Sequence, residues 1–352
     1  MCVSWNWGYN QRMKTLITGA TGFLGGALAR RLHGMGWDVT ALGRNPEKLK
    51  LLEAEGIKTL QADIEDETSM MDACNDREIV FHCAAFPSPW GKYDAFYKTN
   101  VLGTRNVARG CLEKNAKRLV YVSTPSIYFS YSSRMGVKEN DPLPKPISHY
   151  AKTKLLAEQE IDNAHAEGLP VVSIRPRALF GPGDTVLFPR LIPRLQSGKL
   201  PVLGDGQNII DLTYIDNVVD ALLLCAESPS NTLGKKYNIS NDEPIKLWEL
   251  VRLLCKELGI APPQRTIPQS LAYGAAFMFE TASALSSDKP EPMLTRLTVS
   301  MMSNSTTLNI SAAKTELGYR PRVSVAEGVY RFLKWWKEKS KPKENPLRSL
   351  AV

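Results

Sequence analysis

The sequence of 352 residues has few of the features that mark secreted, metal-binding or membrane-spanning proteins. Its six cysteines are scattered with no Cys-x-x-Cys pair, which argues against a disulfide framework or a metal site and favours a reduced, cytoplasmic setting. Residues 1–12 lack the basic start and apolar core of a signal peptide, so we expect a dispensable extension before Met13. No transmembrane span, internal repeat or nucleic-acid-binding module is recognisable. These absences leave a globular chain that suits one two-lobed enzyme.

The excess of positive charge is mild, with 44 Lys and Arg residues against 36 Asp and Glu residues. Much of it lies between Lys334 and Lys343, beside Trp335 and Trp336, and residues 341–352 form a basic tail. Such a segment is compatible with peripheral contact to an anionic membrane surface. We favour the alternative, in which the helix before the tail packs its aromatic side on the protein and the tail is solvated.

A tyrosine and a lysine four residues apart are the first candidates for chemistry. Tyr150 and Lys154 would share one face of a helix, on neighbouring turns. A tyrosine has an ordinary pKa near ~10, and a fixed positive charge beside it lowers that pKa. The phenol can then exchange a proton with a carbonyl or alcohol oxygen. The spacing alone is weak evidence, because Tyr330 and Lys334 repeat it where we expect only a solvated helix face.

A glycine-rich turn near the start of the chain predicts a dinucleotide-binding site. It follows a short apolar strand, 14–18, and precedes a helical pattern from Leu24 to about Met35. In such a unit the glycines permit a tight turn and close approach of a pyrophosphate, and the helix N-terminus favours the phosphates. The spacing is G-x-x-G-x-x-G rather than G-x-G-x-x-G. The predicted cofactor residues of this turn are Gly19, Thr21, Gly22, Phe23, Leu24 and Gly25.

The end of the second predicted strand, 38–42, indicates which nicotinamide cofactor is preferred. An Asp or Glu normally stands there in NAD sites and accepts a hydrogen bond from the ribose 2′-hydroxyl. This chain has Gly43 followed by Arg44, whose guanidinium can grip a 2′-phosphate. We therefore predict NADP(H), with NAD(H) as the alternative if Arg44 only stacks on adenine. Asp63 and Ile64, which follow the next strand, are placed to touch the adenine.

Apolar runs and helical patterns alternate along the first half of the chain. Further strands are expected at about 59–63, 79–85, 118–124 and 170–176, and helices at about 45–55, 67–75, 93–115 and 147–167. This alternation predicts an α/β protein with a doubly wound parallel sheet. The fourth strand ends in small residues, Ala84 and Ala85, as a buried strand beside a cofactor should.

Five motifs occur in the order found in one large family. They are the glycine turn, Asn100 in the segment 98–104, Ser123-Thr124, Tyr150-x-x-x-Lys154, and the run RPRALFGPG at 175–183. Across about residues 14–338 the chain resembles the extended short-chain dehydrogenase/reductase superfamily, of the NAD-dependent epimerase/dehydratase type. The resemblance implies a Rossmann domain at 13–185, a smaller C-terminal substrate domain at 186–340 whose residues 206–240 return to the sheet, and a homodimer.

The resemblance also assigns roles to individual residues. Tyr150 would be the acid/base, and Lys154 would tune it and hold the nicotinamide ribose. Thr124 would hydrogen-bond the substrate oxygen, and Pro176 would lie where the backbone meets the carboxamide. Asn100 would support the site, although a packing or capping role is the alternative.

The substrate side of the chain departs from the sugar-nucleotide members of the superfamily. These typically carry an Arg-Asp pair that helps to bind the nucleotide diphosphate, and here Ile210 stands at the place of the arginine. The run 213–219 is instead similar to the 3β-hydroxysteroid dehydrogenase/isomerase-like branch. A proline-stiffened aromatic loop at 86–90 suits a hydrophobic substrate, unless it is only a packed surface loop. The candidate substrate residues are Pro87, Trp90, Ser126 and Phe180.

The segment 271–279 is apolar almost all round and too short to span a bilayer. It has three interpretations: a lid over an apolar pocket, an interfacial helix, or a buried core helix. The resemblance to enzymes of sterols and long-chain 3-oxo acids favours the lid.

Together these features predict an NADP(H)-dependent, metal-free oxidoreductase that interconverts a ketone and a secondary alcohol on a sterol-like or long-chain 3-oxo/3-hydroxy substrate. Two rival functions are a nucleotide-sugar epimerase or dehydratase with tightly bound NAD, and a non-catalytic NADP(H)-binding sensor. Ile210 argues against the first. The set of Tyr150, Lys154, Thr124 and Asn100 argues against the second, because a sensor needs no proton donor.

Overall fold

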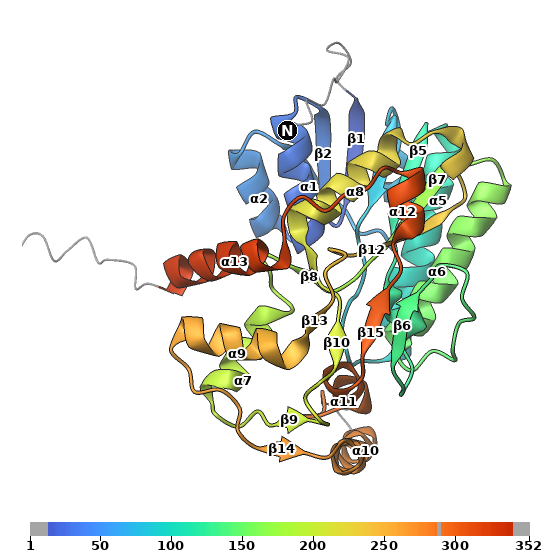
Figure 1. Cartoon of the computed structure of the whole chain (residues 1–352). Coiled ribbons are helices and arrows are strands. Elements are labelled where there is room, and N and C mark those ends of the chain that lie inside the picture. Colours follow the sequence, from blue (N-terminus) through green and yellow to red (C-terminus); the bar gives the residue numbers. More distant parts are fainter. Residues whose placement is uncertain (1–12, 287–289, 341–352) are drawn as a thin grey trace, which may run out of the picture.

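The computed structural model describes residues 13–286 and 290–340, which form one large sheet with its helices and a smaller lobe beside it (Figure 1). The sheet is parallel throughout, in the order β12-β7-β5-β4-β1-β2-β3. Its strands are β1 (Lys14–Thr18), β2 (Asp38–Gly43), β3 (Lys58–Gln61), β4 (Ile79–His82), β5 (Arg118–Val122), β7 (Val171–Pro176) and β12 (Lys236–Ile239). The predicted Rossmann-type fold class is confirmed. The predicted extension at 1–12 and tail at 341–352 lie outside the described residues.

Successive strand residues point to opposite faces of this sheet, and helices cover both faces. Leu16 packs on one face and Ile17 on the other, and Val80 and Phe81 alternate in the same way. All four side chains are fully buried. Because neither face of the central strands meets water, these strands are near-continuous apolar runs, which is the pattern that made them recognisable in the sequence.

The helices divide between the two faces according to the residues they bury. On the Ile17 face lie α1 (Phe23–Gly34), α2 (Pro46–Ala54) and α8 (Ile215–Glu227), and on the Leu16 face lie α3 (Glu67–Ala73), α5 (Gly103–Glu113) and α6 (His149–Ala166). Local sequence fixes several helix starts. The side chains of Asn45, Asp66 and Ser148 each accept a hydrogen bond from a backbone N–H of the first turn.

The helix predicted over 93–115 is not uniform. It consists of α4 (Tyr93–Tyr97), a π-helical turn, η1 (Lys98–Leu102), and α5. The wider turn buries Thr99, Asn100 and Val101 together. Such turns occur often at functional sites, because they redirect a side chain without ending the helix.

The chain reverses its direction of travel across the sheet between β1 and β4. It proceeds from β1 to β2 and β3 on one side, then returns to β4 and continues to β5, β7 and β12 on the other. Ligands of open α/β sheets bind at such a reversal, outside the carboxyl ends of the strands. The loops after β1 and β4, which begin at Gly19 and Cys83, meet there.

The smaller lobe is assembled from short strands and helices of the C-terminal half, with some earlier segments. A mixed sheet contains β13 (Ile245–Lys246), β10 (Ile209–Ile210), β15 (Thr306–Leu308) and β6 (Arg134–Val137), and two pairs are β11 (Thr213–Tyr214) with β8 (Leu179–Phe180) and β14 (Thr266–Ile267) with β9 (Val202–Leu203). Its helices are α7 (Phe188–Gln196), α9 (Leu247–Leu258), α10 (Gln269–Leu285), α11 (Arg296–Ser303) and α13 (Val325–Ser340). The short helix α12 (Ser311–Glu316) packs instead on β12, the edge strand of the large sheet (Figure 1). Short 3₁₀ turns are η2 (Pro125–Tyr128) and η3 (Ser230–Thr232).

The last helix, α13, packs its aromatic side on the protein as predicted. Phe332 is fully buried, lies 4.7 Å from the Phe188 ring, and is 5.8 Å from the rings of both Trp335 and Trp336. Tyr330, from the second Tyr-x-x-x-Lys copy, is 64% exposed, which confirms the solvated face expected there. Within the described residues, the helices are all too short or too polar to cross a bilayer.

Candidate functional site

The turn between β1 and α1 leaves no room for a side chain at Gly19 or Gly25. Gly19 has a φ of +72°, and a Cβ there would lie 2.7 Å from the Ala84 backbone. A Cβ at Gly25 would lie 2.4 Å from the Gly19 carbonyl oxygen. Gly22 precedes α1 without a side-chain cap, and the first turn of α1 has no acidic residue. The positive end of the helix therefore has no competing anion, and these residues fit the pyrophosphate of a dinucleotide.

A cavity of about 820 Å³ begins at this turn and continues between the two lobes. It is lined by these predicted residues: Gly19, Thr21, Gly22, Phe23, Leu24, Gly25, Arg44, Asp63, Ile64, Ala84, Ala85, Pro87, Thr124, Ser126, Tyr150, Lys154 and Pro176. At the other end the lining comes from the smaller lobe and includes Leu247, Val251, Leu297, Met301 and Met302. One continuous space thus connects a dinucleotide site with an apolar compartment.

Lys154 is a deeply buried cation within this lining. Its side chain comes from the second turn of α6, and the residue is 1% exposed. The Nζ atom donates to the Tyr121 hydroxyl at 2.7 Å and to the Val122 carbonyl at 2.8 Å. Burial lowers the pKa of Lys154 to about 7, and the field of Glu158 opposes this fall.

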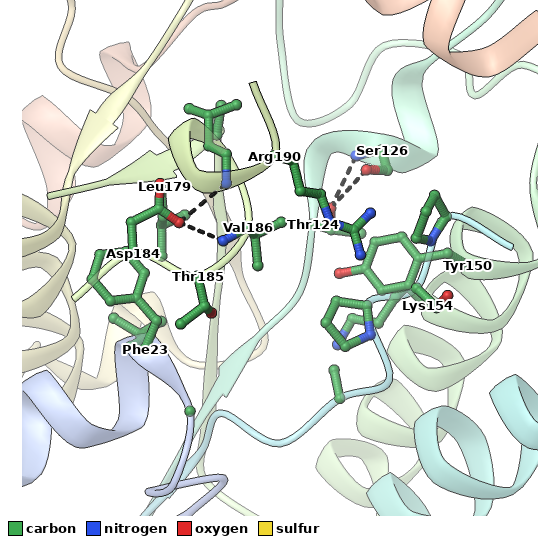
Figure 2. Close-up of a pocket in the computed structure, with 18 of the residues that line it drawn as sticks. Phe23, Thr124, Ser126, Tyr150, Lys154, Leu179, Asp184, Thr185, Val186 and Arg190 are labelled. Carbon is green, nitrogen blue, oxygen red and sulfur yellow. Dashed lines mark hydrogen bonds between the residues drawn. The ribbon is translucent and has the colours of Figure 1, made fainter. Parts of the chain in front are cut away.

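Tyr150 lies in the first turn of α6 (Figure 2). Ser148 caps this helix by accepting a hydrogen bond from the Ala151 N–H at 3.1 Å. Burial raises the pKa of Tyr150 above its ordinary value, and hydrogen bonding with Thr124 opposes the rise. The expectation that Lys154 lowers this pKa is wrong for the structure. The lysine directs its hydrogen bonds at Tyr121 and Val122, so burial of the phenol dominates.

A hydroxyl pair lies at the end of β5, beside Tyr150. Thr124 begins the η2 turn: its Oγ1 accepts from the Ser126 N–H at 3.1 Å and donates to Ser126 Oγ at 3.0 Å (Figure 2). Ser123 donates instead to the Glu158 carboxylate at 2.5 Å. Thr124 and Ser126 both line the cavity: the Ser126 hydroxyl keeps its proton for a ligand, and Thr124 can donate to one by exchanging its bond to Ser126.

Asn100 does not line the cavity; it is buried behind residues that do. Its Oδ1 accepts from the Phe86 N–H at 2.7 Å, and its Nδ2 donates to Thr153 Oγ1 at 3.0 Å. The residue is 1% exposed. It therefore ties the loop after β4 to the residue next to Lys154, which makes it a positioning residue rather than a group that touches ligand.

Arg44 and Asp63 lie together at the dinucleotide end of the cavity. The Arg44 Nη1 atom is 3.3 Å from the Asp63 carboxylate, and the two side chains are 58% and 39% exposed. An exposed ion pair of this kind contributes little to stability. The guanidinium is therefore free to exchange the carboxylate for another anion.

Two predicted substrate residues lie outside the cavity lining. Phe180 is fully buried in the core, with its ring 5.6 Å from those of Phe188 and Tyr214, which corrects its assignment to the substrate. Trp90 is partly buried in the loop after β4, where its backbone N–H donates to the Ser88 hydroxyl. Its neighbours Pro87, Ser88 and Pro89 line the cavity, but Trp90 does not. The aromatic character of this loop therefore does not reach the cavity through Trp90.

Several lining residues were not singled out from the sequence, among them Phe129, Arg177, Leu187, Leu297 and Met301. Leu187, Leu297 and Met301 carry no sequence signal, because apolar side chains are as common in cores as in cavities. Arg177 did carry one. It is a second arginine directly after Pro176, within a run whose other members are mostly apolar.

The apolar segment 271–279 belongs to α10, which is neither a core helix nor part of the cavity lining. Leu271, Met278 and Leu285 are 66%, 67% and 84% exposed. Helix α10 packs against α11. There the Glu280 carboxylate accepts hydrogen bonds from the Arg296 backbone N–H and Nε, both at 2.7 Å. The core interpretation is wrong, and α11 rather than α10 closes the cavity. An interfacial role for α10 stays a prediction.

Metal chemistry has no candidate site in the described part of the chain. No group of three or more His, Cys, Asp or Glu side chains between residues 13 and 286 or between 290 and 340 is arranged to hold an ion. Fold and site together define a Rossmann-type dinucleotide-binding enzyme with a second, apolar compartment.

Comparisons with known proteins agree with this class. The model of the "NAD dependent epimerase/dehydratase family" matches residues 15–240, and the chain belongs to this family. The chain is 36% identical to a 2-alkyl-3-oxoalkanoate reductase of Stenotrophomonas maltophilia, over 91% of this chain and 98% of that protein. It is 35% identical to a 3beta-hydroxysteroid-dehydrogenase/decarboxylase of Arabidopsis thaliana, over 83% and 70%. A solved structure of MoeE5 with UDP-glucose and NAD superposes with a TM-score of 0.74 at 26% identity, covering 93% of this chain and all of that one.

These relatives confirm the predictions of an enzyme and of an oxidoreductase, and of similarity to the 3β-hydroxysteroid dehydrogenase branch of the extended short-chain dehydrogenase/reductases. The predicted role of each residue, the preference for NADP(H) and the homodimer stay predictions.

Proposed function

We propose that the protein is an NADP(H)-dependent oxidoreductase that interconverts a ketone and a secondary alcohol on a hydrophobic substrate. The observation that carries the proposal is the continuity of the cavity, which joins the glycine turn, Tyr150 with Thr124, and the apolar lining from the smaller lobe. The reductase and the steroid dehydrogenase among the relatives support the same reaction class.

The chain's own residues manage the proton and exclude water. A nicotinamide dinucleotide would bind along the glycine turn, Arg44, Lys154 and Pro176. Its nicotinamide would provide or accept the hydride. In ketone reduction Tyr150 donates its phenolic proton to the oxygen that becomes negative, and Thr124 hydrogen-bonds the same oxygen. In alcohol oxidation Tyr150 takes the proton back. The apolar lining keeps water from the reacting oxygen and so strengthens both interactions.

A panel of apolar ketones and alcohols tests this function. Purified protein is incubated with each compound and NADPH or NADP⁺, and the absorbance of the reduced nicotinamide is followed. Sterols, long-chain 3-oxo acids and their 3-hydroxy counterparts are expected to change the absorbance, and short sugars and nucleotide sugars are not. Turnover of none of the apolar compounds would contradict the proposal.

Cofactor preference depends on Arg44. Arg44→Ala is expected to weaken NADPH binding about tenfold, because a hydrogen bond to a charged group contributes about 1.5–3 kcal/mol and this side chain is half exposed. NADH binding should change less than about threefold, since NADH has no 2′-phosphate for the guanidinium to bind. Fluorescence titration of both cofactors measures the two effects. Arg30→Ala, which removes an exposed arginine outside the cavity, is the matched control.

Wild-type protein that binds NADH as tightly as NADPH would contradict the preference for NADP(H). Equal loss of both cofactors in Arg44→Ala would instead mean that the guanidinium serves the adenine, which both cofactors share.

The raised pKa of Tyr150 predicts different pH profiles for the two directions. Reduction needs the protonated phenol, which is present throughout neutral pH, so kcat/KM for the ketone should be flat from about pH 6 to 9. Oxidation needs the phenolate, so kcat/KM for the alcohol should rise about tenfold per pH unit over that range. Steady-state rates in overlapping buffers check both. An oxidation profile that levels off below pH 8 would show that the site holds an acidic phenol after all.

The structural similarity to nucleotide-sugar enzymes favours one second candidate, an epimerase or dehydratase with tightly bound NAD. Ile210 lines the cavity at the place where the resemblance puts a phosphate-binding arginine, and an apolar side chain cannot bind a diphosphate. NAD that copurifies and never exchanges with added cofactor would favour this candidate.

A further inference from the structure

Two arginines flank Pro176 at the end of β7, and their environments differ. Arg175 is fully paired: its Nε and Nη2 donate to the Glu158 carboxylate at 2.8 and 2.5 Å. Arg177 is equally buried, at 6% exposure, but its Nε has no hydrogen-bond partner. Burying a guanidinium whose N–H groups lack acceptors costs free energy, and an anion bound in the cavity would remove that cost.

The surroundings of Arg177 hold it in place, but they offer its Nε no hydrogen-bond acceptor. Its guanidinium carbon lies 4.5 Å from the centre of the Phe129 ring, which also lines the cavity. Asp211 is the one carboxylate whose field raises the Arg177 pKa, and burial outweighs it, so that the pKa falls to about 10. Asp211 is therefore a partial counter-ion, but its carboxylate accepts its hydrogen bond from the Leu308 N–H at 2.6 Å and not from the guanidinium. Arg177 therefore stays charged at neutral pH.

The position of Arg177 relates it to the reacting groups. It follows Pro176 directly, and Phe129 ends the η2 turn that Thr124 begins. Both Pro176 and Thr124 line the cavity, as does Arg177 itself. Val122 and Ile174 pair in the neighbouring strands β5 and β7, so Thr124 and Arg177 leave the sheet at the same edge, from adjacent strands.

We propose that Arg177 binds a carboxylate of the substrate, so that the enzyme acts on long-chain 3-oxo or 3-hydroxy acids in preference to neutral ketones and alcohols. This inference rests on the function proposed above. The guanidinium offers a fork of N–H donors that matches a carboxylate, and the buried setting makes that pairing strong. The names of two relatives agree: a 3-oxoalkanoate is a carboxylate, and a decarboxylase must bind one.

Paired substrates and variants test the assignment. We compare a 2-alkyl-3-hydroxyalkanoic acid with its methyl ester, which has the same carbon chain and no charge, in the wild type, Arg177→Met and Arg177→Lys. The wild type should prefer the acid, and Arg177→Met should lower kcat/KM for the acid on the order of 100-fold while changing the ester less than about threefold. Arg177→Lys should fall between, because it keeps the charge but loses the fork. Arg252→Met removes an exposed arginine of α9 that does not line the cavity, and it should leave both substrates within about threefold.

Binding without turnover separates this inference from the proposed function. Dodecanoate is titrated calorimetrically into the wild type and Arg177→Met, and its affinity should fall on the order of 100-fold in the variant. Turnover of neither acid nor ester, with this loss of dodecanoate binding retained, would sink the proposed reaction and leave the carboxylate site standing. Equal losses of acid and ester, or unchanged dodecanoate binding, would make Arg177 a structural residue. Tight UDP-glucose binding that Arg177→Met abolishes would assign the arginine to a phosphate and also overturn the inference.

Discussion

Tyr150→Phe is expected to lower turnover at least about 10³-fold, because no other group in the described site can donate a proton to the substrate oxygen from the same position. Thr124 hydrogen-bonds but is not acidic enough to replace the phenol, and Lys154 directs its hydrogen bonds at Tyr121 and Val122. The affinity for NADPH should change less than about threefold, since the glycine turn and Arg44 are untouched. Steady-state rates and a fluorescence titration of NADPH measure the two quantities.

The chain contains its own control for this substitution. Tyr330→Phe alters the second Tyr-x-x-x-Lys copy on α13, where the tyrosine is 64% exposed, and it should leave turnover within about twofold. Turnover above a few per cent in Tyr150→Phe would contradict the mechanism. A parallel loss of NADPH affinity would point to a damaged site rather than a missing proton donor.

Glu158→Gln is expected to destabilise the protein by about 3–5 kcal/mol, because it leaves a buried guanidinium without its counter-ion. The Glu158 and Arg175 side chains are 3% and 4% exposed. The carboxylate also accepts from Ser123, and its field raises the pKa of Lys154 one turn away. Unfolding by denaturant gives the free energy, and thermal unfolding should show a fall in Tm of roughly 6–10 °C.

Two further variants distinguish the buried pair from ordinary surface charge. Glu160 lies two residues along α6 and pairs with Arg105 at 2.8 Å, but the Arg105 side chain is 44% exposed. Glu160→Gln should therefore cost less than about 1 kcal/mol. The double variant Glu158→Gln/Arg175→Met should recover much of the lost stability, because removing both charges is far less costly than removing one. Similar losses in Glu158→Gln and Glu160→Gln would show that burial of the pair contributes nothing.

Recognition of the fold from the sequence succeeded where the evidence is local. Strands buried on both faces are mostly apolar, so β1, β4, β5 and β7 were visible as near-continuous apolar runs. The turn after β1 needs glycine for two reasons that operate within seven residues, a positive φ at Gly19 and contact of Gly25 with the Gly19 carbonyl.

The errors and omissions concern side chains whose partners are far away in the sequence. Phe180 lies within a motif next to the site, the run 175–183, yet its ring packs against Tyr214 in the core. Lys154 was expected to act on Tyr150, four residues before it, but its hydrogen-bond acceptors come from β5, more than thirty residues away. Spacing along one helix places two side chains on a common face, but it does not decide which neighbour each one contacts.

The sequence by itself determined the α/β fold, the glycine turn and the set of candidate reactive side chains, because each follows from patterns within one or two elements. Only the tertiary structure decided their electrostatics: burial raises the pKa of Tyr150 and lowers that of Lys154, and Glu158 neutralises Arg175. It also decided that Arg177 lies unpaired in the cavity. The physical reason is that desolvation and pairing depend on every element that packs around a charge, and those elements meet only in the folded chain.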